Sequence, residues 1–409
     1  MKCRHCAAPL DHVCLDLGSA PPSNAYLSDA ALRAPELWYP LRLLVCERCW
    51  LVQTEDHAGR DALFSDDYAY FSSFSSSWLA HAEAYVKAMR TRFGLTGASL
   101  VSEVAANDGY LLRYVRDEGI PCYGIEPTAS TARAARALGL DIVERFFGVE
   151  LARELASAGR RVDLVAANNV LAHVPDINDF VAGFTALLKD HGVATFEFPH
   201  LLRLLRENQF DTVYHEHYSY LSLGAVKRVF ESNGLAVFDV EEHPTHGGSL
   251  RVFAQRADTG GRATTEAVAR VLHEEAGDGL ASASGYEGFQ AKVDKVKDDF
   301  MAYLIEARRA GRRVAAYGAA AKGNTLMNYA GVRPDLIAFV VDRNPAKQGR
   351  FMPGSRIPIV AEERLREARP DDVVLLPWNL RDELMAQLAY VREWGGRFVT
   401  AVPSLKVVP

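Results

Sequence analysis

Apolar segments alternate with amphipathic helical segments through the middle of this chain. Five short apolar runs are predicted strands, at Leu100–Val104, Tyr123–Ile125, Ile142–Arg145, Leu164–Ala167 and Val193–Glu197. Helical spacing separates most of them, notably over Ala129–Leu138. This alternation predicts right-handed crossovers and a doubly wound parallel sheet, where ligands bind beyond the carboxyl ends of the strands. The residues that follow each strand are therefore the first candidates for a site.

The chain is too long for one ordinary core, and it divides into three parts. Of its 409 residues, 1–65 hold cysteines, prolines and short apolar runs, and 66–255 hold the alternation. A polar, partly flexible helical connector is predicted over 256–285, before a long amphipathic helix and a second strand–helix alternation. Val373–Leu376 and Phe398–Val402 are predicted strands of that second sheet. We expect an N-terminal module (1–65), a middle domain (66–255) and a C-terminal α/β domain (256–409).

The composition is that of a globular protein, and it limits the classes of binding partner. The formal net charge of −6 argues against binding nucleic acid by general electrostatics. No apolar run approaches the roughly 20 residues that a membrane span needs, and the N-terminus lacks the apolar region of a secretion signal. We expect a cytoplasmic protein with reduced cysteines, and nothing in the sequence requires more than a monomer.

Two cysteine pairs of identical spacing begin the chain. Their members are Cys3, Cys6, Cys46 and Cys49, each pair being separated by two residues. Four thiolates form a closed tetrahedral set that suits a structural Zn²⁺. His5 and His12 are close enough in sequence to replace a ligand, whereas Cys14 and Cys122 have no partner at such spacing. The alternative is a set of free buried cysteines.

The turn after the first predicted strand is acidic and contains a single glycine. Glu103, Asn107, Asp108 and Gly109 lie in it. A nicotinamide dinucleotide site would need three glycines and room for a pyrophosphate, which these acidic groups would repel. A cationic sulfonium ligand suits the turn better.

Polar residues also follow the second and fourth predicted strands. Glu126 is placed to accept hydrogen bonds from a ribose diol, and Asn168 and Asn169 follow the fourth strand. Together these clusters resemble the class I methyltransferase fold, with Glu126 as the ribose ligand, although each cluster alone could simply cap a helix. Phe146 and Phe147, after the third strand, either flank an adenine or belong to the core.

The densest polar cluster is the run Tyr214-His215-Glu216-His217. Its histidines are two residues apart, which is not the i, i+4 spacing of a helical zinc pair. Acid–base chemistry is the favoured interpretation, because imidazole titrates near neutral pH and a neighbouring carboxylate can orient it. A purely structural cluster is the alternative.

A second polar run precedes the middle domain. It contains Tyr68, Tyr70, Ser72, Ser73 and Ser75. Its hydroxyls and amides could contact a phosphorylated substrate. They could equally cap the helix that follows.

The C-terminal region holds a strand, a small-residue turn and a helix start around Lys322. Such a helix N-terminus beside a lysine is a candidate pyrophosphate site. A nicotinamide site is the rival, but Gly318 and Gly323 do not fit its glycine pattern, and Asp342 is the only candidate for its ribose ligand.

Nearly the whole chain resembles the sugar C-methyltransferases that act on nucleotide-linked 4-keto-deoxysugars in antibiotic and surface-glycan biosynthesis. The resemblance lies in the two cysteine pairs together with the segments 68–73, 107–109, 124–127, 169–173, 214–217, 317–324 and 341–349. The order of these segments is specific, although no single one is. Ala105-Ala106 departs from the family, which often has glycine or serine there.

The resemblance implies a small-molecule C-methyltransferase that uses S-adenosylmethionine and a structural zinc. It implies that His217 removes the C3 proton next to the 4-keto group and that Glu216 orients or polarises this base. His173 and Tyr214 would stabilise the enolate or position the keto oxygen, and Tyr68 or Tyr70 would close the site. The nucleotide sugar, expected to carry dTDP, would contact Ser72, Ser73, Ser75, Lys322 and Asn324. An O- or N-methyltransferase of another metabolite and a dinucleotide-binding redox protein are the rivals.

Overall fold

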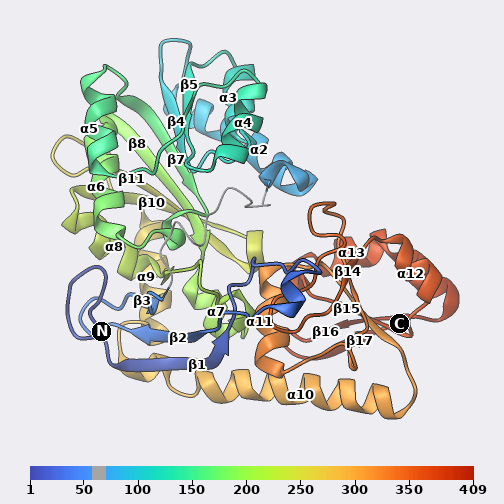
Figure 1. Ribbon diagram of the computed structural model, residues 1–409. Coiled ribbons are helices and arrows are strands. Elements are labelled where there is room, and N and C mark those ends of the chain that lie inside the picture. Colours follow the sequence, from blue (N-terminus) through green and yellow to red (C-terminus); the bar gives the residue numbers. More distant parts are fainter. Residues whose placement is uncertain (58–70) are drawn as a thin grey trace.

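Three β-sheets form the framework of the protein in a computed structural model, which describes residues 1–57 and 71–409 (Figure 1). We call the four-stranded sheet with its cysteine loops the cysteine module. The seven-stranded sheet with its helices is the middle lobe, and the six-stranded sheet with its helices is the C-terminal lobe. Tyr68 and Tyr70 lie outside the described residues.

The middle lobe contains a doubly wound sheet with the order β10-β11-β8-β7-β4-β5-β6. Its strands are β4 (Val101–Val104), β5 (Cys122–Ile125), β6 (Ile142–Val143), β7 (Val162–Asn168), β8 (Leu188–Pro199), β10 (Leu235–His243) and β11 (Ser249–Arg256). Strands β4 to β8 run parallel to one another, and β11 is antiparallel to both of its neighbours, β10 and β8. The predicted parallel α/β sheet is therefore confirmed, with two additional strands at one edge.

Helices cover both faces of this sheet. One face carries α2 (Ser76–Phe93), α3 (Leu112–Asp117) and α4 (Ala129–Ala137), and the other carries α5 (Val149–Ser157), α6 (Ile177–Leu187) and α8 (Leu223–Ser232) (Figure 1). Buried side chains of the strands fall into two separate apolar clusters, one on each face. Burial on both faces explains why the central strands read as continuous apolar runs.

The cysteine module is a wedge between the two lobes. Its sheet joins β1 (His12–Ala20), β2 (Tyr39–Val45), β3 (Val52–Thr54) and the distant strand β9 (Ser219–Tyr220). Side chains alternate along β2, so that Leu43 packs into a core shared with the C-terminal lobe and Leu44 into a core shared with the middle lobe. Both faces of the small sheet are thus buried by other parts of the chain.

The C-terminal lobe has a second, mainly parallel sheet with the order β14-β13-β12-β15-β16-β17. Its strands are β12 (Val314–Tyr317), β13 (Val340–Val341), β14 (Ile359–Val360), β15 (Asp372–Leu375), β16 (Arg397–Thr400) and β17 (Lys406–Val408). Its helices are α10 (Phe289–Arg309), α11 (Ala321–Ala330), α12 (Glu363–Ala368) and α13 (Arg381–Gln387). The predicted connector contains α9 (Glu266–Gly277), which packs on the middle lobe.

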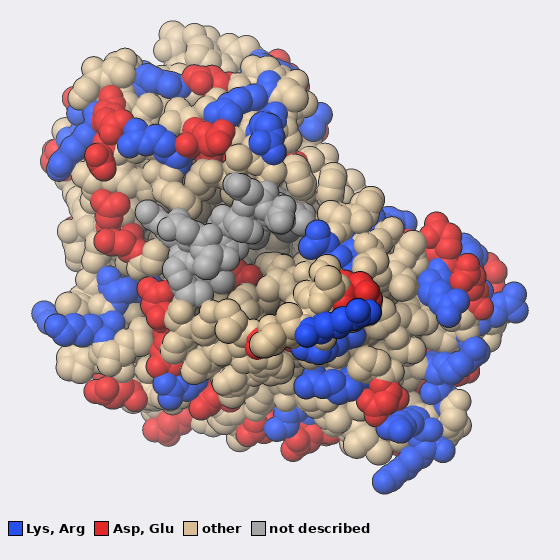
Figure 2. Space-filling view, in the orientation of Figure 1, with Lys and Arg blue, Asp and Glu red and all other residues tan. Residues whose placement is uncertain are grey.

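The surface is hollowed between the middle lobe and the C-terminal lobe (Figure 2). On this face Lys and Arg side chains are interspersed with Asp and Glu (Figure 2). None of the helices in residues 1–57 and 71–409 has the length and apolar character that a bilayer crossing requires.

Candidate active site and metal centre

The turn after β4 has an unusual backbone. Ala105, Asn107 and Gly109 all have positive φ, of 60°, 50° and 79°. A Cβ on Gly109 would come within 2.4 Å of the Leu140 side chain, so only glycine fits there. The departure at Ala105 therefore stands where a glycine would adopt the same left-handed conformation with less strain.

Three carboxylates, those of Glu103, Asp108 and Glu126, lie at this turn. Glu103 is fully buried on β4, and burial raises its pKa well above the ordinary value. The two oxygens of Glu126 accept the backbone N–H groups of Asn107 and Thr128, both at 2.9 Å. A carboxylate has about four lone-pair positions. Glu126 can therefore hold the turn and still accept a ribose hydroxyl.

The donor and acceptor pattern of the turn fits the expected S-adenosylmethionine. Oδ1 of Asp108 and Oδ1 of Asn169 are buried with no hydrogen-bond partner among the described residues. Such atoms cost free energy unless a ligand or water satisfies them. Acceptors and negative charge suit the amine, hydroxyl and sulfonium groups of that cofactor and disfavour a pyrophosphate.

The serine run contacts this turn. The backbone N–H of Ser72 donates to Asn107 Oδ1 at 3.0 Å, and Ser73 donates to Asp108 through both its N–H and its hydroxyl. Ser75 is exposed and caps α2 by accepting the N–H of Trp78. The capping interpretation therefore describes Ser75, and Ser72 and Ser73 support the turn after β4.

Asn168 ends β7, and Asn169 directly after it lies beside a histidine that sequence reasoning missed. Asn169 has a φ of 52°, and its Nδ2 donates to Nε2 of His246 at 3.2 Å. His246 itself has a φ of 56° and lies in η5 (Thr245–Gly247), between β10 and β11. The pair of glycines after it, Gly247-Gly248, was the available signal for a tight functional turn.

The two phenylalanines after β6 lie in different surroundings. Phe147 packs against Phe180 and Phe184 in the core of the middle lobe. Phe146 is 38% exposed and lies outside that core. The core interpretation thus applies to Phe147 alone.

His217 is held by hydrogen bonds on both ring nitrogens. Its Nδ1 lies 3.0 Å from the Thr212 carbonyl, and its Nε2 lies 2.8 Å from the Tyr214 hydroxyl. Because a carbonyl can only accept, Nδ1 carries the proton and Nε2 is the basic nitrogen, which accepts from Tyr214. The Tyr214 and His217 rings also pack with centroids 4.0 Å apart.

His173 completes this group, whereas the Glu216 side chain points elsewhere. His173, in η3 (Leu171–His173), packs edge-on against His217 with ring centroids 4.6 Å apart and donates from Nδ1 to the Glu216 carbonyl. The Glu216 carboxylate accepts from Asn24 Nδ2 at 3.2 Å. In the structure the His217 ring is therefore oriented by Thr212 and Tyr214, and Glu216 faces the segment around Asn24.

Burial keeps these histidines neutral. It lowers the pKa of His217 well below its ordinary value, and the positive charges that His173 and Lys322 can carry lower it further. Burial also lowers the pKa of His173 and of His246 to about 4. The same effect raises the pKa of Glu216 above its usual range. The site thus holds imidazoles that are neutral near pH 7.

Lys322 borders this group from the C-terminal lobe. Its Nζ donates to Asn379 at 3.1 Å and lies 4.8 Å from the centre of the Trp378 ring. Asn324, two residues later in α11, is fully buried and donates to the Ser23 carbonyl. Lys322 therefore lies beside Trp378 and Asn379, whereas Asn324 joins the cysteine module to the C-terminal lobe.

The dinucleotide crevice of the C-terminal lobe is filled by the chain itself. Asp342, after β13, accepts the N–H of Ala319 at 2.8 Å and lies 3.7 Å from Nζ of Lys347. Lys347 and the Tyr26 hydroxyl both donate to the Ala319 carbonyl. The side chains of Tyr26 and Lys347 therefore occupy the turn beside Asp342 that a nicotinamide dinucleotide would have to approach.

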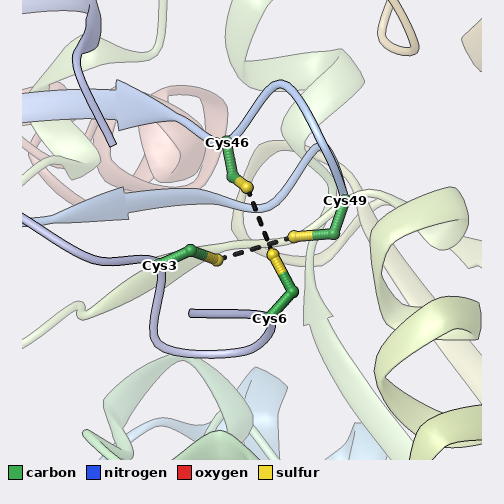
Figure 3. A group of neighbouring side chains, drawn as sticks. All are labelled: Cys3, Cys6, Cys46 and Cys49. Atoms are coloured by element: carbon green, nitrogen blue, oxygen red, sulfur yellow. Dashed lines mark hydrogen bonds between the residues drawn. The ribbon is translucent and has the colours of Figure 1, made fainter. Parts of the chain in front are cut away.

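The four predicted cysteines converge on one point (Figure 3). Cys3 and Cys49 have Sγ atoms 3.6 Å apart, Cys6 and Cys46 have theirs 3.5 Å apart, and all four lie within 4.8 Å of one another. A tetrahedral site with Zn–S bonds of about 2.3 Å separates its sulfurs by roughly 3.8 Å. The cysteines therefore fit Zn²⁺ without rearrangement.

The neighbouring side chains agree with a four-cysteine site. Nε2 of Gln53 donates to Sγ of Cys3, the kind of outer contact that stabilises a thiolate ligand. His5 contacts Asn178 and His12 contacts Glu47, so neither replaces a cysteine. Cys14 lies apart, in the core of β1.

The cysteine module holds the segment that carries His217. β3 begins three residues after Cys49 and pairs with β9, through Val52 opposite Tyr220. The Thr54 hydroxyl donates to the His217 carbonyl at 2.9 Å. A strand that follows the cysteine cluster thus fixes the backbone at His217.

Three family models match successive parts of the chain. They are described as "Putative zinc binding domain" over residues 3–64, "Methyltransferase domain" over 79–240 and "C-methyltransferase C-terminal domain" over 244–403. The C-methyltransferase NovU of Streptomyces niveus is 36% identical over 409 residues, which cover 100% of this chain and 96% of that protein.

Solved methyltransferase structures resemble part of the chain. The 1,6-didemethyltoxoflavin-N1-methyltransferase of Burkholderia thailandensis, with bound 1,6-didemethyltoxoflavin and S-adenosylhomocysteine, is 17% identical over 51% of this chain and 96% of its own, with a TM-score of 0.38. Magnesium protoporphyrin IX methyltransferase of Synechocystis PCC 6803, with bound SAM, is 15% identical over 44% and 79%, with a TM-score of 0.34.

Proposed function

Because the chain belongs to the family of C-methyltransferases that includes NovU, we propose that it methylates C3 of a nucleotide-linked 4-keto-deoxysugar, with dTDP as the expected nucleotide. The observation that carries this proposal is the hydrogen-bond pattern of His217. A neutral imidazole with its basic Nε2 beside a tyrosine hydroxyl is suited to remove a carbon-bound proton next to a ketone.

The residues of the β4 turn are proposed to hold the cofactor. Glu126 would accept the ribose hydroxyls, Asp108 and Asn169 offer unpaired acceptors, and Phe146 would flank the adenine. Glu103, Asn107, Gly109 and Asn168 shape the surrounding turn. When bound, S-adenosylmethionine supplies the electrophilic methyl group.

His217 is proposed to accept the C3 proton at Nε2. The C3–H bond breaks, its electron pair delocalises onto the 4-keto oxygen, and Nδ1–H of the resulting imidazolium stays on the Thr212 carbonyl. A low pKa secures the neutral base but makes protonation costly. The enolate charge beside the ring offsets that cost, because opposite charges at short range favour the charged form.

His173, Tyr214 and Lys322 surround the atoms that would become charged. Tyr214 and Lys322 carry donors for the developing charge, and donors so placed typically contribute on the order of 10²–10³ in rate. His173 has its single N–H, on Nδ1, bonded to the Glu216 carbonyl, so its part is to position the keto group or the His217 ring. Lys322 brings a positive charge near the enolate, and the sugar's diphosphate is proposed to continue along the same lobe. Ser72 and Ser73 support the cofactor turn in this scheme, and Tyr68 and Tyr70 remain the predicted residues that close the site.

Deuterium exchange at C3 tests the proposal. Exchange is followed by NMR in D₂O with S-adenosylhomocysteine and a panel of nucleotide 4-keto-6-deoxysugars, and methylation of the same sugars is followed by mass spectrometry with S-adenosylmethionine. We expect His217→Asn to lose on the order of 10²–10³ in exchange and methylation together. His215→Asn, a buried neighbour that faces Tyr39, is the matched control.

Tyr214→Phe then separates two proton paths. If the proton travels through the tyrosine oxygen, this variant loses exchange as His217→Asn does. If His217 takes it directly, exchange persists. A product methylated on oxygen or nitrogen would refute the C3 proposal and support the O- or N-methyltransferase rival.

A further inference from the structure

The carbonyl that fixes the His217 tautomer is itself held from the C-terminal lobe. Thr212 ends η4 (Phe210–Thr212) and accepts Nδ1–H of His217 at 3.0 Å. Its two sequence neighbours are both hydrogen-bonded to the C-terminal lobe. Nε1–H of Trp378 donates to Asp211 Oδ2 at 2.8 Å, and the Thr325 hydroxyl donates to the Val213 carbonyl at 2.7 Å.

The Asp211 carboxylate lies in an unusual environment, because charged side chains are seldom fully buried. The residue is fully buried, and its Oδ1 has no partner within the described part of the chain. Burial raises its pKa to about 6, against the lowering effect of Lys322 and the Trp378 hydrogen bond. Backbone hydrogen bonds of Asp211 and Thr212 also lower the pKa, and the Trp378 N–H is the hydrogen bond that ties this carboxylate to the C-terminal lobe.

Trp378 also reaches the opposite wall of the site. A Cβ placed on Gly247 would lie 2.6 Å from Cη2 of the indole, so the ring packs directly on the turn that presents His246. Gln209 spans the same gap, because its Nε2 donates to the Gly247 carbonyl at 2.7 Å. One indole thus touches the segment of the base and the segment of His246.

We propose that Trp378 is a positioning residue for methyl transfer: through Asp211 it fixes the Thr212 carbonyl and thereby the orientation of His217. This inference rests on the proposed role of His217 as the base. The C-terminal lobe then contributes to the chemical step, in addition to any part it takes in holding the nucleotide.

The test compares two tryptophans of the same lobe in the full-length enzyme. Trp378→Phe keeps an aromatic ring and removes the N–H that Asp211 accepts. Trp394→Phe is the matched control, because its Nε1–H donates to the Pro370 carbonyl at 2.9 Å, outside the site. The turnover number, KM for the sugar, C3 exchange and melting midpoint are measured for each.

We expect Trp378→Phe to lower turnover and exchange together by about 10- to 100-fold, with KM changed less than twofold, because small misplacements of a reacting group are costly. Turnover equal to that of Trp394→Phe would overturn the inference, as would a rise in KM at unchanged turnover. If Trp378→Phe fails to fold, Thr325→Val removes the second hydrogen bond and must show the same split. Absence of exchange in the unmodified enzyme on every sugar would instead remove the proposed function.

Discussion

His173, His217 and His246 carry no charge at neutral pH, because burial lowers the pKa of each. In the unfolded chain each would titrate near 6.5. Between about pH 4 and 6.5 the unfolded state therefore binds protons that the folded state excludes. Their contribution to stability is complete above pH 6.5 and is lost as the pH falls below it.

We predict that His246→Asn weakens this acid sensitivity. Asparagine tolerates the positive φ of 56° at this position, so the backbone should be kept. Removing one buried neutral histidine should reduce the fall in unfolding free energy by on the order of 1 kcal/mol per pH unit below pH 6.5. Urea unfolding at pH 7.5 and at pH 5.5 measures the change.

His191→Asn serves as the control for that comparison. His191 is an exposed histidine near the start of β8. Its substitution should leave the difference in unfolding free energy between the two pH values as in the unmodified protein. An equal effect of both substitutions would contradict burial as the cause.

At the level of single residues, the sequence identified which polar side chains gather at the site but not which groups they are hydrogen-bonded to. The tautomer of His217 depends on a carbonyl five positions away, and Glu216 faces Asn24 across 192 positions. Adjacency in the chain suggested that Glu216 orients its neighbour. The backbone turns between them, so adjacent side chains in this segment point to different surroundings.

At the scale of elements, the metal centre and the proposed base are joined by one short strand pair. β3 follows Cys49, pairs with β9 and donates through Thr54 to the His217 carbonyl. Losing the metal should therefore disturb catalysis without any zinc at the reacting atoms.

We predict that Cys46→Ala loses bound zinc, lowers C3 exchange by at least tenfold and destabilises the cysteine module. Structural zinc contributes folding free energy directly, and β3 would lose its anchor. Elemental analysis, exchange and thermal unfolding measure the three effects. The matched control is Cys14→Ala, which removes a buried thiol of the same module outside the sulfur cluster.

Cys14→Ala should keep one zinc per chain and its exchange rate. Loss of zinc from Cys46→Ala with full exchange would show that β9 holds His217 without help from the metal centre.

Sequence patterns predicted the long strands β7 and β8 but not β9, because two residues carry no measurable periodicity. Such a strand exists only where a partner edge is presented to it.

At the scale of the whole molecule, ligand binding should distinguish the two nucleotide-type folds. We predict that S-adenosylhomocysteine raises the melting midpoint and that NADH does not. A ligand at a hundredfold excess over its dissociation constant stabilises by about 2.7 kcal/mol. The middle lobe offers buried acceptors without partners among the described residues, whereas in the C-terminal lobe Tyr26 and Lys347 occupy the turn beside Asp342.

Glu126→Ala should abolish the shift caused by S-adenosylhomocysteine. Glu144→Ala, which removes an exposed carboxylate of the same lobe that pairs with Arg136, should preserve it. A shift with NADH that survives Glu126→Ala would mean that the C-terminal lobe binds a dinucleotide.

The domain limits at residues 65 and 255 stay predictions, which limited proteolysis of the full chain would test.

The sequence alone determined the chemistry available at each strand end, the four metal ligands and the alternation that produces the sheets. These features are local, because periodicity and fixed spacing report the burial and turns of a short window. Only the tertiary structure decided which lobe supports which residue. Trp378 meets Asp211 across 167 positions and Asn324 meets Ser23 across 301. Directional hydrogen bonds between distant elements leave no local pattern, since they arise only when the packed cores bring those elements together.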